Sequence, residues 1–165
     1  MNLLRNTFLV MGAVMLVAAP AMAEEQSRID GFAVRALVGG NGQTAALFGT
    51  EGLSFRAGSF YMGGAGSGGA FLGSSSGGMG YGGFITGVAD RLGGATYDLR
   101  VLLGGGGGKV NGEGGGGIVV EPSIGVGMSL ANGWNPSLTA SYLYMRNNPN
   151  MSGATVGLRI NFPVK

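Results

Sequence analysis

The sequence predicts an all-β fold, an antiparallel up-and-down transmembrane β-barrel of about eight strands that follows a cleaved signal peptide. Three observations lead to this fold class: an export signal at the N-terminus, strands that alternate between apolar and polar residues, and a composition with much glycine and little charge. A period of two gives a strand one apolar and one polar face. The clearest strand covers residues 154–162, with its apolar positions at Ala154, Val156, Leu158, Ile160 and Phe162.

Residues 1–23 have the pattern of a signal peptide for the Sec export pathway. Arg5 supplies a positive charge, an apolar run spans residues 8–19, and a small-x-small cleavage site ends at Ala23. A retained transmembrane helix is the alternative, but the apolar run is shorter than the roughly 20 residues that a spanning helix needs. The mature chain is therefore expected to be residues 24–165, a single domain that crosses a membrane with strands.

The composition excludes several classes of function. The chain has 37 Gly, no Cys and no His, and only 11% of its residues are charged. Without Cys and His it lacks disulfides and the usual ligands of zinc, haem and copper, so we expect no cofactor and no metal site. The formal net charge is only +2 and the basic residues are scattered, so no nucleic-acid surface is expected.

Alternation along the mature chain predicts eight strands. The second of them is short, and the fourth has no clear facing. Pro122 cannot donate to a ladder, so we expect a bulge or irregularity there. The predicted strands cover residues 32–38, 43–48, 53–61, 81–89, 96–103, 118–130, 137–144 and 154–162.

The connections are expected to differ in length. Glycine loses more entropy on ordering than any other residue, so the two Gly-rich tracts, residues 63–80 and 104–117, are interpreted as mobile loops. Such longer loops alternate with short turns, as in outer-membrane barrels, and both termini then lie on the short-turn side, the periplasm. The third longer loop is residues 147–152, and the short turns are residues 49–52, 90–94 and 131–135; only the turn at residues 39–42 departs from this trend.

The apolar faces need a cover, which is either a second sheet or lipid. The opposite faces carry mainly small residues and a few charges, whereas the solvated surface of a sandwich usually has more Lys and Glu. In the narrow lumen of an eight-stranded barrel, such residues fill the space as a salt-bridged plug, which we favour over a narrow polar pore. The expected lumen cluster is Arg35, Arg56, Asp98, Arg100, Glu121 and Arg159.

Aromatic residues near strand ends form a second candidate set. Rings that are half apolar and half polar prefer a membrane interface, although tyrosine is also common in strands generally. The expected aromatic girdle is Tyr61, Tyr97, Trp134, Tyr142, Tyr144 and Phe162.

These features together resemble the small eight-stranded outer-membrane β-barrel proteins of bacteria, as a class. The resemblance covers most of the mature chain and includes its last strand, residues 156–162, which ends on Phe162. It implies a monomer in the outer membrane, in contact with lipid and lipopolysaccharide, that is inserted by the outer-membrane assembly machinery. Terminal strands of this class typically end the chain on an aromatic residue, whereas here Pro163, Val164 and Lys165 follow Phe162.

The same resemblance bears on catalysis. Barrels of this class that act on lipid A depend on a His with a Ser, and this chain has no His. Ser74, Ser75 and Ser76 lie in the first Gly-rich tract without a nearby base. We therefore expect no enzyme but a structural or surface-interaction protein. A secreted Gly-rich protein that self-assembles into fibres is the alternative, and a soluble periplasmic sandwich is a third hypothesis.

Overall fold

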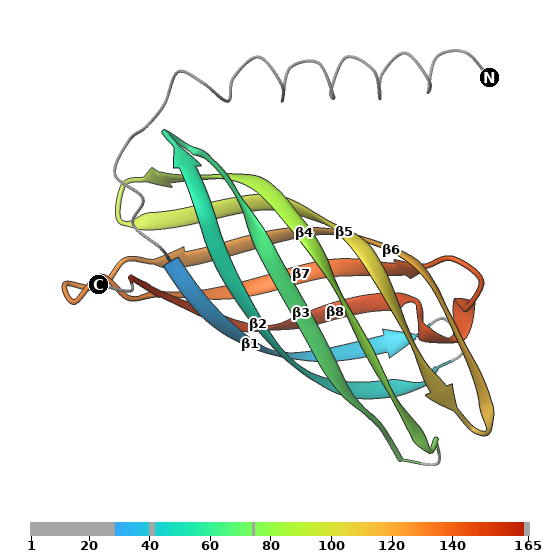
Figure 1. Cartoon of the computed structure of the whole chain (residues 1–165). Coiled ribbons are helices and arrows are strands. Elements are labelled where there is room, and N and C mark those ends of the chain that lie inside the picture. The colour runs from blue at the N-terminus through green and yellow to red at the C-terminus, as the bar shows by residue number, and fades with distance from the viewer. Residues whose placement is uncertain (1–28, 40–41, 74, 164–165) are drawn as a thin grey trace, which may run out of the picture.

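The computed structural model describes residues 29–39, 42–73 and 75–163, and these residues form eight antiparallel strands. The predicted signal peptide lies outside these residues. The described residues form strands, turns and one short 3-10 helix (Figure 1). The elements are β1 (Ile29–Gly39), β2 (Thr44–Ala57), β3 (Phe60–Leu72), β4 (Gly77–Leu92), β5 (Ala95–Val110), β6 (Glu113–Met128), β7 (Asn135–Met145), η1 (Pro149–Met151) and β8 (Gly153–Pro163).

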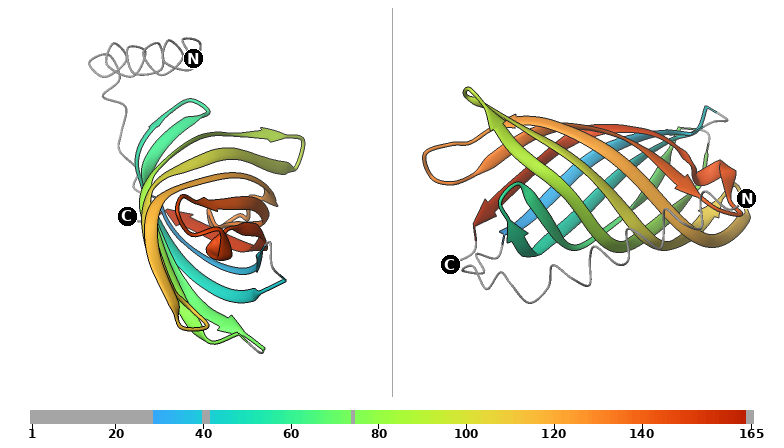
Figure 2. Two further views of the ribbon diagram at one scale, coloured as in Figure 1. Left: turned by 90° about the vertical axis from the view of Figure 1, so that its right-hand side faces the viewer. Right: turned by 90° about the horizontal axis from the view of Figure 1, so that it is seen from above.

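The strands close into a barrel in which each strand pairs with its neighbours in the sequence and β1 pairs with β8 (Figures 1 and 2). The closing ladder runs without a register shift from Ile29 opposite Pro163 to Gly39 opposite Gly153. The predicted all-β barrel of eight strands is confirmed. The start of β1 and the end of β8 lie at one end of the barrel, here called the termini end; the other end is called the far end.

The wall is apolar outside and carries its charges inside. Along β1, residues at even positions are exposed and residues at odd positions are buried, so Phe32 and Val34 point outward while Arg35 points inward. Leu158 in the middle of β8 is 63% exposed, whereas its neighbour Arg159 is 3% exposed. The facing predicted for residues 32–38, 96–103, 118–130, 137–144 and 154–162 agrees with this burial.

Both Gly-rich tracts are strands, so their interpretation as mobile loops is wrong. Residues 63–80 belong to β3, β4 and the turn between them, and residues 104–117 belong to β5, β6 and a two-residue turn. Inward glycines let neighbouring strands of the tightly curved wall approach each other. A Cβ at Gly83 or at Gly104 would collide with a backbone carbonyl oxygen of the adjacent strand. Closure of the barrel thus outweighs the entropy that glycine loses on ordering.

The predicted difference in connection length is also wrong. Residues 49–52 are not a turn but the middle of β2, and the true turn lies at Gly58 and Ser59. Two-residue turns occur at both ends of the barrel, with Gly58 at the termini end and Gly112 at the far end in the positive-φ region that glycine tolerates. The barrel has long strands in place of the expected long loops. β4, β5 and β6 are each 16 residues long, whereas β1, β7 and β8 are each 11 residues long. The β5–β6 hairpin therefore extends the far end on one side (Figure 1).

Pro122 causes less disturbance than expected. The register of β6 with β7 is the same on both sides of this residue, and partners are missing only at Glu121 and Pro122. The register shift in the barrel lies instead in β2, between Leu53 and Phe55. The described residues contain no helix that is long and apolar enough to cross a membrane.

Candidate functional site: the barrel interior

The interior brings together charged side chains from β1, β2, β5, β6 and β8. Of the predicted cluster, Arg35 comes from β1, Asp98 and Arg100 from β5, Glu121 from β6 and Arg159 from β8. All five point inward, because each occupies the polar phase of its strand. Their ion pairs form two connected groups in the barrel.

The first group is centred on Arg35 and Glu121, which form an ion pair across the lumen from β1 to β6. The Arg35 guanidinium also donates to the Ser67 hydroxyl at 2.6 Å and to the Tyr81 hydroxyl at 2.8 Å. Ser141 donates a hydrogen bond to Glu121. A buried charge is tolerated where a counter-charge and further hydrogen bonds replace the lost water, and this arrangement supplies both.

The second group is centred on Glu51 of β2. Its carboxylate pairs with Arg100 and lies 3.8 Å from Nε of Arg159. Arg159 in turn reaches Asp98, with 3.0 Å between Nη2 and Oδ1, and the Tyr61 hydroxyl donates to the other oxygen of Asp98. Among the residues that the structure describes, three arginines thus face three carboxylates in these ion pairs, so their formal charges cancel.

Arg56 and Tyr61 are placed differently from the prediction. Arg56 is exposed at the termini end, where its Nε donates to the carbonyl oxygen of Gly58 at 3.2 Å, and it takes no part in the described ion pairs. Tyr61 is 3% exposed inside the barrel, so its assignment to an outer girdle is wrong. Tyr61 follows the turn at Gly58 and Ser59 and belongs to β3, whose alternation points it inward. After the register shift beside Ser54, Arg56 lies opposite Tyr61, so it is on the same inner side, at the rim of the barrel.

Glu51 is the main residue that sequence reasoning missed. Glycines flank it at positions 49 and 52 and favour a turn there. The period of two starting at Leu47 and continuing to Leu53 would have placed Glu51 on one face of a longer strand. Both of these leucines are buried in the interior. Because leucine is also the type of residue expected on the lipid-facing side, the sequence alone does not show that this face points inward.

The other aromatic residues of the predicted girdle lie on the outer face or at the rim. Tyr97, Trp134 and Phe162 are near the termini end, where the Phe162 ring lies 6.0 Å from that of Trp134 and 6.5 Å from that of Phe32, centroid to centroid. Tyr142 and Tyr144 lie nearer the far end of β7 and are about half exposed. Aromatic rings therefore occur outside the wall toward each end.

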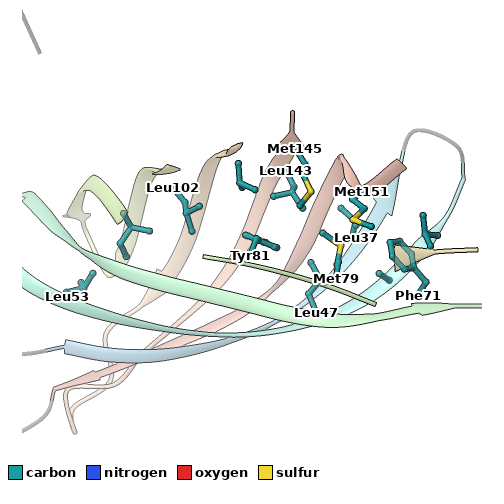
Figure 3. Close-up of a cluster of buried hydrophobic side chains, with 14 of the residues drawn as sticks. Leu37, Leu47, Leu53, Phe71, Met79, Tyr81, Leu102, Leu143, Met145 and Met151 are labelled. Atoms are coloured by element: carbon teal, nitrogen blue, oxygen red, sulfur yellow. The ribbon is translucent and has the colours of Figure 1, made fainter. Parts of the chain in front are cut away.

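Buried apolar side chains line the interior, and Figure 3 shows Leu53 apart from the group around Leu37, Met145 and Met151, which lies toward the far end. Leu37, Leu47, Leu143, Met145 and Met151 are all at most 1% exposed. Met151 belongs to η1, which folds over the far opening when the barrel is viewed end-on (Figure 2). The interior is therefore occupied by an apolar cluster next to η1 and by ion pairs beyond it.

A cavity of about 270 Å³ opens at the termini end. Asp98 and Arg159 line its inner part, and Arg56, Asp90 and Arg91 line its outer part. Leu53 and Tyr61, two buried residues of the interior, also line it. Within the described ranges, no group of three or more His, Cys, Asp or Glu side chains is arranged to hold a metal ion.

Comparison with known proteins places the fold among small outer-membrane barrels. No protein-family model and no curated protein matches the sequence. Among solved structures, the chain is similar to Neisserial surface protein A, with 13% identity, a TM-score of 0.64, and coverage of 86% of this chain and 99% of that one. It is also similar to the N-terminal β-barrel domain of OprF from Pseudomonas aeruginosa (10% identity, TM-score 0.58, 86% and 100% covered). A third similar structure is Ail, the attachment invasion locus protein of Yersinia pestis (14% identity, TM-score 0.58, 87% and 100% covered).

Proposed function

We propose that this chain is a non-enzymatic outer-membrane β-barrel protein with a structural or surface-interaction role. The observation that carries the proposal is the distribution of side chains across the wall: large apolar residues lie outside and paired charges lie inside. In water this arrangement would expose the apolar side chains of every strand, whereas in a bilayer it removes them from water and leaves no unpaired strand edge in lipid.

A plug explains the interior better than a pore does. Arg35, Glu121 and Arg159 are each at most 7% exposed, and the apolar cluster around Leu143 and Met151 closes the remaining length of the lumen. An ion crossing the barrel would have to displace both layers. The buried ion pairs therefore stabilise the barrel in this proposal and do not conduct.

Catalysis is disfavoured by the state of the interior acids. Glu51, Asp98 and Glu121 are each paired with an arginine, so none is left free as a base or a nucleophile. The sequence also lacks His and Cys. The alternative of a fibre-forming protein needs free strand edges to stack, whereas closure of β1 on β8 gives each strand two neighbours.

A role at the cell surface is supported by the hairpins of β3–β4 and β5–β6 at the far end. Two of the similar structures are a surface protein and an attachment invasion locus protein, and we extend this kind of role to the present chain as part of the proposal. The chain is proposed to be a monomer in contact with lipid and lipopolysaccharide, inserted by the outer-membrane assembly machinery, and without a nucleic-acid partner.

Fractionation of cells that express the full precursor tests this proposal. We expect the protein in the outer membrane, with a gel mobility that differs between unboiled and boiled samples because the folded barrel resists the detergent. Recovery from the soluble periplasm would reject the barrel in lipid, and detergent-insoluble fibres would favour the alternative. Conductance across planar bilayers then separates plug from pore: the plug predicts no channel activity, and steady single-channel steps would contradict it.

A further inference from the structure

The far end of β6 has an open edge. β6 pairs with β5 along its whole length, and the hairpin that they form projects at the far end (Figure 1). The ladder of β6 with β7 begins only at Val119, and one further hydrogen bond joins the Arg146 amide to the carbonyl oxygen of Ile118 at 2.9 Å. Beyond Arg146 the chain leaves the wall and enters η1. Among the described residues, no strand therefore lies beside residues 113–117 on this side of β6.

The hydrogen bond of Ile118 shows which backbone groups the open edge presents. Successive residues of an antiparallel strand direct their N–H and C=O groups to opposite sides. Because Ile118 bonds toward β7, Gly116 and Gly114 direct their groups to the same side, which is open, whereas Gly115 and Gly117 direct theirs to β5. Gly114 and Gly116 are both exposed. The N–H and C=O groups of these two glycines are therefore available to an incoming strand.

The open edge lies beyond the apolar band of the outer wall. The large apolar side chains on the outer face end at Ile118 on β6 and at Leu103 on β5, which are both exposed. Farther along β5 the outward positions are Gly105, Gly107 and Lys109. An unpaired strand edge is not tolerated in hydrocarbon, so its place beyond the band agrees with a barrel that spans a membrane. In that membrane the edge would lie in water, on the side opposite the termini end.

Glycine also decides which partner suits the edge. Cross-strand pairs of side chains stabilise a sheet, but residues 114–117 of β6 and residues 104–108 of β5 are all glycine. A second copy of the same edge would add backbone hydrogen bonds without side-chain contacts. A strand with aromatic or β-branched residues would instead lay its side chains over the bare glycines, as aromatic residues do when they rescue glycine in a sheet. The edge therefore favours a different chain over a second copy.

The charges beside the edge specify the partner further. Lys109 lies opposite Gly114, and Arg146 follows the end of β7; both side chains are exposed. Neither takes part in an ion pair with a carboxylate of the described residues. Residues 114–117 themselves carry no charge and no proline, which are common means of blocking the pairing of an edge strand. Acidic side chains on the partner would meet the two cations.

We propose that this edge binds an extended peptide segment of another protein as an added β-strand. The segment carries aromatic or β-branched side chains that cover the glycines and acidic side chains that meet Lys109 and Arg146. In such strand addition the backbone hydrogen bonds supply affinity and the side chains supply specificity. This inference rests on the proposed surface-interaction role and deepens it by naming the kind of partner.

Amide exchange measured by NMR on the barrel refolded in lipid nanodiscs tests the edge. In the free barrel, we expect the amides of Gly114 and Gly116 to exchange about tenfold or more faster than those of Gly115 and Gly117, the size of one hydrogen bond. The probe is an acetylated heptapeptide that alternates tyrosine and threonine between two terminal glutamates. At millimolar concentration it should slow the Gly114 and Gly116 amides about tenfold or more.

Several outcomes would overturn the proposal. One is equal exchange of the four amides in the free barrel, and another is exchange that the peptide leaves unchanged. Slowing that rises with barrel concentration without peptide would indicate a second copy as the partner. Equal slowing by a peptide with lysine in place of glutamate would contradict an acidic partner, and equal slowing by a peptide with proline at alternate positions would contradict strand addition, because proline cannot complete a ladder.

A matched pair of variants at Gly114 locates the binding. Gly114→Pro removes an open N–H group that the ladder with β5 does not use, so folding should persist while the peptide no longer slows the Gly116 amide. Gly114→Ala keeps the N–H group, and its Cβ would lie 3.4 Å from the carbonyl oxygen of Gly108, so it should respond like the parent protein. Unchanged slowing in the proline variant, or equal loss in the alanine variant, would refute the edge as the site.

Gel mobility of unboiled samples separates two kinds of failure. A chain that forms no heat-modifiable barrel in lipid would contradict the proposed function itself. A folded barrel in the nanodisc whose open edge ignores the peptide would overturn only the strand addition.

Discussion

Removal of one partner from the ion pair of Arg35 and Glu121 should destabilise the barrel strongly. The two side chains are 6% and 4% exposed, so loss of the carboxylate leaves a guanidinium almost without water. Such uncompensated burial costs about 3–5 kcal/mol. We therefore expect Glu121→Leu to lower the free energy of unfolding by about that amount, and Arg35→Met to act similarly because it leaves Glu121 buried.

The double variant Arg35→Met/Glu121→Leu decides whether the pair itself matters. It buries no charge, so its loss should be smaller than the sum of the two single losses, although the hydroxyls of Ser67, Tyr81 and Ser141 lose a partner. The measurement is urea unfolding of the refolded barrel in lipid vesicles, followed by the mobility of unboiled samples on a denaturing gel. Losses that simply add, or a single-variant loss below about 1 kcal/mol, would show that the interior charges do not stabilise the barrel as a pair.

Three further changes test other parts of the wall. Leu158→Arg, at a 63% exposed position in the middle of β8, should cost about 2–4 kcal/mol and block insertion into the membrane. Leu130→Arg, beside a turn, is the control and should be tolerated. Normal assembly of the Leu158→Arg variant, judged by membrane fractionation, would contradict the lipid-facing assignment. Gly104→Ala should cost about 1–3 kcal/mol in the same unfolding assay, because its inward Cβ would collide with the adjacent strand. Gly105→Ala points outward with its nearest neighbour at 3.8 Å, so equal losses in the two glycine variants would refute this steric argument. Tyr61→Phe removes the only hydroxyl donor to the partly buried Asp98 among the described residues and should cost about 1–3 kcal/mol; an unchanged urea midpoint would argue against this hydrogen bond.

Sequence reasoning performed best where both faces of a strand differ in chemistry. The last strand, residues 154–162, alternates between large apolar and polar or small residues, and its predicted limits differ from those of β8 by one residue at each end. The charged residues on such strands, Arg35, Asp98, Arg100, Glu121 and Arg159, all face inward as expected. It failed where residues such as Leu53 are apolar and yet point into the lumen, because hydropathy alone does not separate a lipid-facing side chain from a buried interior one.

The sequence by itself determined the all-β class, the number of strands and the apolar outer face, since these follow from a local period of two along each strand. Only the tertiary structure decided that the Gly-rich tracts are wall, that Tyr61 belongs to β3 and faces the interior, and that Glu51 joins Arg100 and Arg159. These features depend on curvature and on contacts between distant strands. Curvature makes glycine necessary where strands approach closely, and closure of the barrel brings together charges that lie far apart in the chain.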